Sequence, residues 1–115
     1  MRAQRSGVIA NLGSIGGWRG APACGWYCAT KFAIAGLTES LRAEVAHLGV
    51  EVTCIDLGAF RTQLKNNSIG VEKPREDAGP AVEMVKKYLA ARNGKQPGDP
   101  AKAARVIVDA LTKSG

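Results

Sequence analysis

The sequence predicts an α/β fold built on parallel strands, and three stretches carry that prediction. Residues 7–13 and 50–57 are short runs that are apolar on both faces, as buried strands of a parallel sheet must be. Between them, residues 24–47 repeat apolar side chains at helical steps of three and four. A strand, a helix and a strand in that order predict a βαβ unit with a right-handed crossover.

The predicted helix over residues 24–47 carries signals for its start, its end and its packing face. It follows residues 14–23, whose glycines and single proline indicate a loop with tight turns. Gly49 is placed to end the helix in the left-handed conformation. The expected apolar stripe consists of Ile34, Leu37, Leu41, Val45 and Leu48.

Two more helices are predicted after the second strand. They follow a connection over residues 58–79, and a loop of that length at a sheet edge is usually functional or mobile. One helix fits Pro80–Arg92, with proline at its first position and an Asn-Gly stop behind it. The other fits Pro100–Lys113, with Asp99 as its cap. The chain therefore has about two strands and three helices.

Composition narrows the classes of function. The chain has 115 residues, enough for one domain, and a net charge of +6. Its basic residues are scattered and only 5% of its residues are aromatic, so we expect no nucleic-acid partner. No apolar run approaches the ~20 residues of a membrane span, so we expect no membrane partner. Three Cys and one His lack the spacing of a zinc site, and the odd cysteine count fits a cytoplasmic protein without bound metal.

Three residues stand out where the first strand ends and the first helix begins. Ser14 follows the strand directly, at the carboxyl edge where open α/β sheets bind ligands. Tyr27 and Lys31 are four residues apart, which places both side chains on one face of a helix. Taken singly, the three fit a turn serine, a core tyrosine and a surface lysine. Their combination in this order indicates a site.

These residues resemble the signature of the short-chain dehydrogenase/reductase family. That family has a Y-x-x-x-K pair, here Tyr27 and Lys31, and an active-site serine a little over three helical turns earlier, here Ser14. It also has a strand-end motif, Pro-Gly followed by a threonine, here residues 57–62. The resemblance is to the C-terminal half of family members only, and it runs from residue 7 to residue 111.

The resemblance implies a partial Rossmann-like, doubly wound parallel sheet. Residues 1–115 would form the C-terminal catalytic and substrate-side part of a single NAD(P)-binding domain. The N-terminal dinucleotide-binding half would be absent, since no G-x-G-x-x-G stands between a strand and a helix here. Leu57 departs from the family, which usually has proline there, and this loosens the turn before Gly58.

The activity that the resemblance implies is hydride transfer between a nicotinamide and a small carbonyl or secondary-alcohol substrate. Tyr27 would be the general acid and base. A free phenol keeps its proton up to a pH near 10, and the ammonium group of Lys31, one helical turn away, would stabilise the phenolate. Ser14 would hydrogen-bond the substrate oxygen and stabilise its developing charge.

The same resemblance implies four residues in contact with the cofactor, which is NAD or NADP. Tyr27 lies at the nicotinamide, and Lys31 would hold the hydroxyls of its ribose. The Gly58 backbone and Thr62 would contact the carboxamide. The choice between NAD and NADP stays open, because the residue that makes this choice belongs to the absent half.

Two functions follow as expectations. The first is an oxidoreductase of which this chain is an inactive fragment on its own. The alternative is a non-catalytic remnant or splice form that acts by protein association, because the family helix that carries Tyr27 lies at a dimer interface and allows a homo-oligomer. Trp18, Trp26 and Phe60 fit either a substrate pocket or ordinary aromatic packing.

Overall fold

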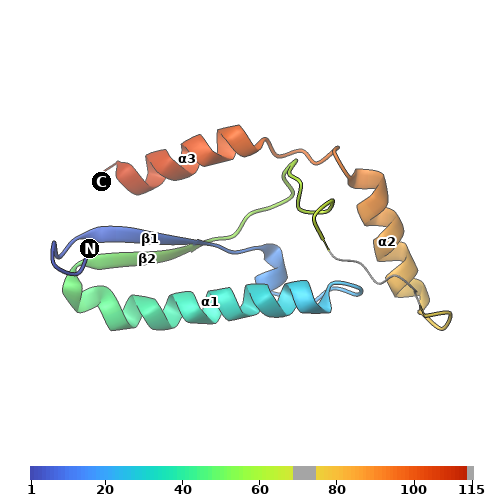
Figure 1. The fold of residues 1–115 in the computed structure, drawn as a ribbon, viewed down its shortest axis with the longest axis horizontal. Coiled ribbons are helices and arrows are strands. Elements are labelled where there is room, and N and C mark those ends of the chain that lie inside the picture. The colour runs from blue at the N-terminus through green and yellow to red at the C-terminus, as the bar shows by residue number, and fades with distance from the viewer. Residues whose placement is uncertain (69–74, 114–115) are drawn as a thin grey trace. The chain divides into compact units, whose positions relative to one another are not determined.

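A computed structural model describes residues 1–68 and 75–113 of the chain. Residues 69–74, part of the predicted connection 58–79, lie outside the described residues. The described chain forms two compact units, Met1–Gly58 and Ala59–Gly115. The first holds two parallel strands and one long helix, and the second holds two helices (Figure 1). The α/β class, with two strands and three α-helices, is confirmed.

The first unit is the predicted βαβ arrangement. Strand β1 (Gly7–Leu12) pairs in parallel with β2 (Val50–Ile55), with Gly7 opposite Val50 and Leu12 opposite Ile55. A 3-10 turn, η1 (Ile15–Gly17), follows β1. Helix α1 (Gly25–Val45) then runs along one face of the two-stranded sheet (Figure 1). Both strands end earlier than predicted, because the ladder of paired residues stops at Leu12 and Ile55.

The crossover from α1 back to the sheet depends on one glycine. A second 3-10 turn, η2 (Ala46–Leu48), follows α1, and Gly49 ends it with φ of +67°. This is the left-handed conformation expected from the sequence, which costs little only for glycine. A Cβ at this position would also meet the carbonyl oxygen of Arg5. The turn therefore both reverses the chain and packs against the segment before β1.

The core of the first unit is small and partly polar. Val50 and Val52 of β2 are each 4% exposed, and Cys28 of α1 is 5% exposed. The most buried residue is Thr38, at 1%. Leu37, which the sequence placed on the apolar stripe, is 57% exposed. The other predicted members of the stripe, Ile34, Leu41, Val45 and Leu48, are half-buried, so the predicted face packs on the sheet and only Leu37 lies outside the contact.

Hydrogen bonds from polar side chains join α1 to the sheet. Asn11 Nδ2 donates to Thr38 Oγ1 at 2.9 Å, and that hydroxyl donates to the carbonyl of Ile34 at 2.6 Å. Farther along α1, Arg42 Nε donates to the carbonyl of Val52 at 2.7 Å. The buried Thr38 hydroxyl is tolerated at this contact because it both donates and accepts a hydrogen bond.

The second unit contains α2 (Pro80–Arg92) and α3 (Pro100–Thr112). Helix α2 has the predicted bounds, and α3 ends one residue before the predicted Lys113. Asp99 caps α3 as expected, because its carboxylate accepts from the first free N–H groups of the helix at 2.9 and 3.3 Å. The start of α2 is therefore marked by proline at its first position, and the start of α3 by the Asp99 cap.

Hydrogen bonds join the segment before α2 to the connection before α3. Arg61 Nη1 donates to the carbonyls of Gln96 and Pro97 at 2.6 and 3.2 Å. Phe60 forms an isolated parallel bridge with Gly98, where a Cβ would overlap the phenyl ring.

Within the described residues, no helix combines the length and the apolar character needed to cross a bilayer.

Candidate active site

Ser14 lies at the carboxyl end of β1, where the sequence placed it. Its backbone is extended, and its Oγ accepts a hydrogen bond from the N–H of Gly16 at 3.2 Å, which caps η1. The side chain is half-buried. Because a hydroxyl is both donor and acceptor, capping leaves its proton available to an oxygen atom of a bound molecule.

Tyr27 and Lys31 come from the first turns of α1, and the structure ties the lysine to the strand. Lys31 Nζ donates to the carbonyl oxygen of Leu12 at 2.8 Å. The same nitrogen lies 6.0 Å from the centroid of the Tyr27 ring. Tyr27 is 38% exposed, so its phenol is accessible. The last residue of β1 thus anchors the positive charge next to the tyrosine.

Two glycines allow η1 to approach α1 closely enough to complete the cluster. A Cβ on Gly16 would lie 3.0 Å from a ring carbon of Tyr27. A Cβ on Gly17 would lie 2.9 Å from the carbonyl oxygen of Lys31, which is backbone and cannot move aside alone. The structure therefore brings Ser14, Tyr27 and Lys31 to one end of the sheet, and their catalytic roles stay predictions.

The two other predicted cofactor contacts lie beyond β2. Gly58 ends the first unit, and no atom lies within 4 Å of where its Cβ would be, so its backbone is open to an incoming group. Thr62 belongs to the second unit, where its Oγ1 accepts from the N–H of Leu64 at 3.3 Å. Its hydroxyl proton is left for a further partner.

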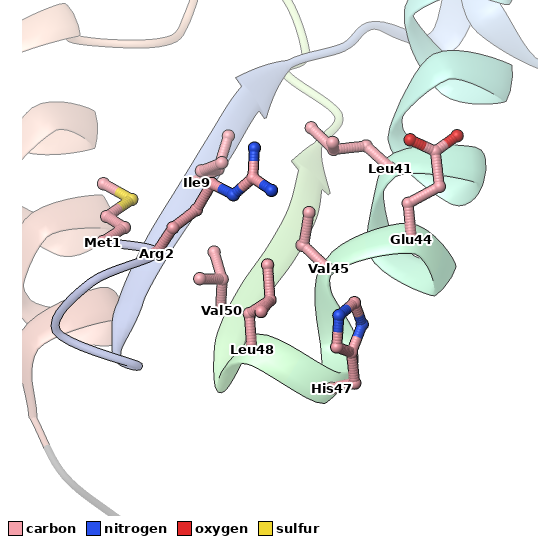
Figure 2. Close-up of a pocket in the computed structure, with 9 residues that line it drawn as sticks. All are labelled: Met1, Arg2, Ile9, Leu41, Glu44, Val45, His47, Leu48 and Val50. Carbon is pink, nitrogen blue, oxygen red and sulfur yellow. The ribbon is translucent and has the colours of Figure 1, made fainter.

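A cavity of the first unit lies away from this cluster. Its volume is about 390 Å³, and it sits where α1 ends and β2 begins (Figure 2). Its lining is mostly apolar, with Arg2, Glu44 and His47 as its charged or polar members. Ser14, Tyr27 and Lys31 do not line it, so we treat it as a packing gap beneath the end of α1.

A second cavity, of about 330 Å³, belongs to the second unit and is polar. Thr62 lines it together with side chains that bond to one another. Asn93 Nδ2 donates to Asn66 Oδ1 at 3.0 Å, and Asn66 Nδ2 donates to Gln63 Oε1 at 2.7 Å. These hydrogen bonds link the three amide side chains that line the cavity with Thr62.

The sequence did not single out Asp56, which the structure places beside the cluster. Asp56 Oδ2 accepts from the indole Nε1 of Trp18 at 2.7 Å. A Cβ on Gly13, the residue before Ser14, would overlap the other carboxylate oxygen. An acidic residue directly after a buried strand was the available signal, because such positions face the ligand-binding edge of a sheet.

In the described part of the chain, the cysteines form no disulfide and the metal-ligating side chains form no group that could hold a metal ion. Cys24, Cys28 and Cys54 are all free thiols, and Cys28 is buried. Residues 1–68 and 75–113 contain no group of three His, Cys, Asp or Glu side chains placed to hold a metal ion.

Comparison with known proteins identifies the family. The family model described as short chain dehydrogenase matches residues 1–72. The chain belongs to the short-chain dehydrogenase family. This is an oxidoreductase family whose members typically depend on NAD(P). An uncharacterized oxidoreductase, YusZ of Bacillus subtilis, is 34% identical to the chain over 109 residues, covering 91% of this chain and 39% of YusZ. Oxidoreductase BOA17 of Botryotinia fuckeliana is 31% identical over 111 residues, covering 96% of this chain and 40% of BOA17.

A solved structure agrees with this assignment. The crystal structure of a short-chain dehydrogenase from Streptomyces avermitilis superposes with a TM-score of 0.77 at 35% sequence identity. The match covers 100% of this chain and 42% of that chain. The chain thus spans about two fifths of the length of these relatives, and its fold is a partial Rossmann-like one.

The expected extent of the resemblance was wrong. The sequence suggested the C-terminal half of the family alone, over residues 7–111, whereas the family model matches residues 1–72, the N-terminal part of this chain. Relatives align from the start of the chain and are covered to about 40%, less than half. Ser14, Tyr27, Lys31 and Thr62 all lie inside the matched range.

Proposed function

We propose that this chain carries the catalytic residues of an NAD(P)-dependent oxidoreductase that transfers hydride between a nicotinamide and a carbonyl or secondary alcohol. One observation supports this above the others. Lys31 Nζ is bonded to the Leu12 carbonyl at 2.8 Å and stands 6.0 Å from the Tyr27 ring, at the strand end that Ser14 follows. Such a group can transfer a proton to an oxygen, because the phenol can donate it and the cation stabilises the phenolate that is left.

The donor set fits the nicotinamide end of a dinucleotide. An ammonium group has three N–H donors, and Lys31 uses one of them on Leu12, which leaves others for ribose hydroxyls. Space beside Gly58 leaves room for a carboxamide, and a contact from Thr62 is carried over from the strand-end motif of the family. When bound, the nicotinamide would supply or accept the hydride.

In the direction of reduction, this chain's residues handle the substrate oxygen. Ser14 donates a hydrogen bond to that oxygen and stabilises its negative charge as the carbonyl carbon is reduced. Tyr27 then gives its phenolic proton to the oxygen, forming the alcohol and leaving a phenolate. The positive charge of Lys31 stabilises that phenolate. In oxidation the same proton moves from the alcohol back to Tyr27.

In this proposal the 115 residues are the catalytic and substrate-side part of one dinucleotide-binding domain, and alone they neither bind a dinucleotide nor turn over substrate. Their sequence has no G-x-G-x-x-G turn between a strand and a helix, the pattern that holds a pyrophosphate. The substrate would be a small carbonyl or alcohol, and the cofactor NAD or NADP.

A second candidate function is self-association through α1, in line with a remnant that acts by binding protein. The side chain of Trp26 is 90% exposed, and that of Leu37 is 57% exposed. They are eleven residues apart, about three helical turns, and so lie on one face. Replacing both by Ser should lower the sedimentation coefficient if this face joins two copies, whereas an unchanged coefficient would exclude it.

The catalytic proposal is tested in a chimera. The matched segment of the Streptomyces avermitilis protein is replaced by this chain, and ketone reduction is followed with NADH and NADPH. Tyr27→Phe, which removes only the transferable proton, should lower turnover by roughly a hundredfold or more, the usual weight of acid–base catalysis. Tyr88→Phe, at a tyrosine of α2 that is 54% exposed, serves as the control and should leave the rate unchanged.

Two results would count against the proposal. One is a Tyr27→Phe chimera that works as fast as its parent, which would remove the role of the phenol. The other is binding of NADH or NADPH by the isolated 115 residues at micromolar concentration, detected by fluorescence titration. That result would show that the chain does not need the remainder of a dinucleotide-binding domain.

A further inference from the structure

The carboxylate of Asp56 lies against the turn that carries Ser14. Asp56 is the residue directly after β2, and one of its oxygens packs so closely on Gly13 that a Cβ there would overlap it. The same oxygen lies 3.8 Å from Cys54 Sγ. The carboxylate is therefore held at the carboxyl edge of the sheet, next to the backbone that leads into Ser14.

The other oxygen of this carboxylate holds an exposed tryptophan. Trp18 Nε1 donates to Asp56 Oδ2 at 2.7 Å, and the Trp18 backbone N–H donates to the carbonyl of Ile15 at 3.0 Å. The indole is nevertheless 75% exposed. An exposed side chain usually samples several rotamers, whereas a hydrogen bond from its only donor to a charged acceptor restricts it. Trp18 is thus a large apolar surface that is open and held in place.

Two exposed apolar side chains, Ile15 and Trp18, follow Ser14 in the chain. Ile15, the next residue in η1, is 60% exposed. The ring of Tyr27 packs on Gly16, the middle residue of the same turn. A molecule whose oxygen reaches the Ser14 and Tyr27 hydroxyls would therefore meet an isoleucine and a tryptophan in the 3-10 turn that follows the serine.

We propose that Asp56 positions the Trp18 indole as a preorganised apolar wall beside Ser14, and that this wall selects carbonyl or alcohol substrates bearing a flat apolar or aromatic group. Rigid aromatic surfaces bind flat groups well because little conformational entropy is lost on contact. The selection of substrate rests on the proposed function, in which Ser14 holds the substrate oxygen. Asp56 acts through Trp18 and is a positioning residue.

The test uses the 115-residue chain and requires no cofactor. The chain has two tryptophans, and Trp18→Phe and Trp26→Phe assign their two indole N–H signals in a ¹⁵N spectrum. Trp26 is 90% exposed and serves as the internal control. Asp56→Ala removes the acceptor and should move the Trp18 signal toward that of an exposed indole, with faster exchange with solvent. Asp56→Asn keeps an acceptor oxygen and should largely preserve the original signal.

Three probes then examine the choice of substrate: acetophenone, dihydroxyacetone and aminoacetone. Acetophenone should shift the Trp18 signal and leave the Trp26 signal in place. Its concentration at half-saturation should be about fivefold lower than that of the other two probes, which corresponds to the free energy of one aromatic contact. Asp56→Ala should weaken acetophenone binding about threefold, and Asp56→Asn should restore most of it.

Several outcomes would overturn the inference. A Trp18 signal unchanged by Asp56→Ala would show that the carboxylate does not position the indole. Equal shifts of both indoles would show non-specific contact. Tightest binding of aminoacetone would show that Asp56 recognises a cation directly. If instead these signals behave as expected while the chimera with this chain lacks activity, the proposed function fails and the positioning role of Asp56 stands.

Discussion

Replacing Thr38 by Val should destabilise the first unit measurably, although the two side chains have nearly the same shape. Thr38 is 1% exposed, and its hydroxyl donates to Ile34 and accepts from Asn11. Valine removes both bonds and leaves the Asn11 amide facing a methyl group. Each lost bond is worth about 1 kcal/mol, and an unpaired buried donor about 1–3 kcal/mol.

The added methyl group offsets part of this loss, by about 0.8 kcal/mol. We therefore expect Thr38→Val to lower the free energy of unfolding by about 2 kcal/mol, which is about a 30-fold change in the unfolding equilibrium. Thr38→Ser keeps the hydroxyl and loses only a methyl group, so it should cost about half as much. Asn11→Ala should remove most of the extra penalty when combined with Thr38→Val.

The measurement is urea unfolding followed by far-ultraviolet circular dichroism for the parent chain, the three single variants and the double variant. The reasoning would be refuted if Thr38→Val were as stable as the parent, or if Thr38→Ser were the less stable of the two. Either result would mean that methyl packing, rather than the Asn11–Thr38 hydrogen bond, holds α1 on β1.

Three further predictions follow from single contacts. Gly17→Ala places a Cβ 2.9 Å from the Lys31 carbonyl, so we expect a loss of about 1–3 kcal/mol in unfolding free energy, and a stable variant would show that η1 can shift. Asp99→Ala removes the cap of α3, and amide exchange in its first turn should rise roughly fivefold, for about 1 kcal/mol. The Arg75 guanidinium lies 2.6 Å from the Asp77 carboxylate and lowers its pKa. Any stability from this ion pair is therefore present at pH values above the ordinary aspartate pKa, and it is lost as the pH falls and Asp77 takes up a proton. In Arg75→Gln the NMR titration midpoint of Asp77 should move up, and an unmoved midpoint would contradict the pairing.

Much of the candidate site was accessible from the order of residues alone. Ser14 after an apolar run, with Tyr27 and Lys31 spaced by one helical turn, predicted a cluster at the sheet edge, and the structure brings these three together. The sequence could not show that Lys31 bonds to the Leu12 carbonyl, because that contact joins residues nineteen positions apart. It also passed over Asp56, whose partner Trp18 is thirty-eight positions away.

The sequence by itself determined the class of the fold and the approximate ends of its helices, because caps, glycine stops and apolar periodicity act over a few neighbouring residues. Only the tertiary structure showed that a polar residue, Thr38, is the most buried position on the packed face of α1. The leucine-rich stripe predicted Leu37 inside, yet Thr38 is buried and Leu37 is exposed. The Asn11 amide of β1 faces α1 and needs a hydrogen-bond acceptor there, which the Thr38 hydroxyl supplies. Periodicity shows which face of a helix is apolar, whereas only the folded structure shows that a polar side chain from another segment pairs with a buried hydroxyl on that face.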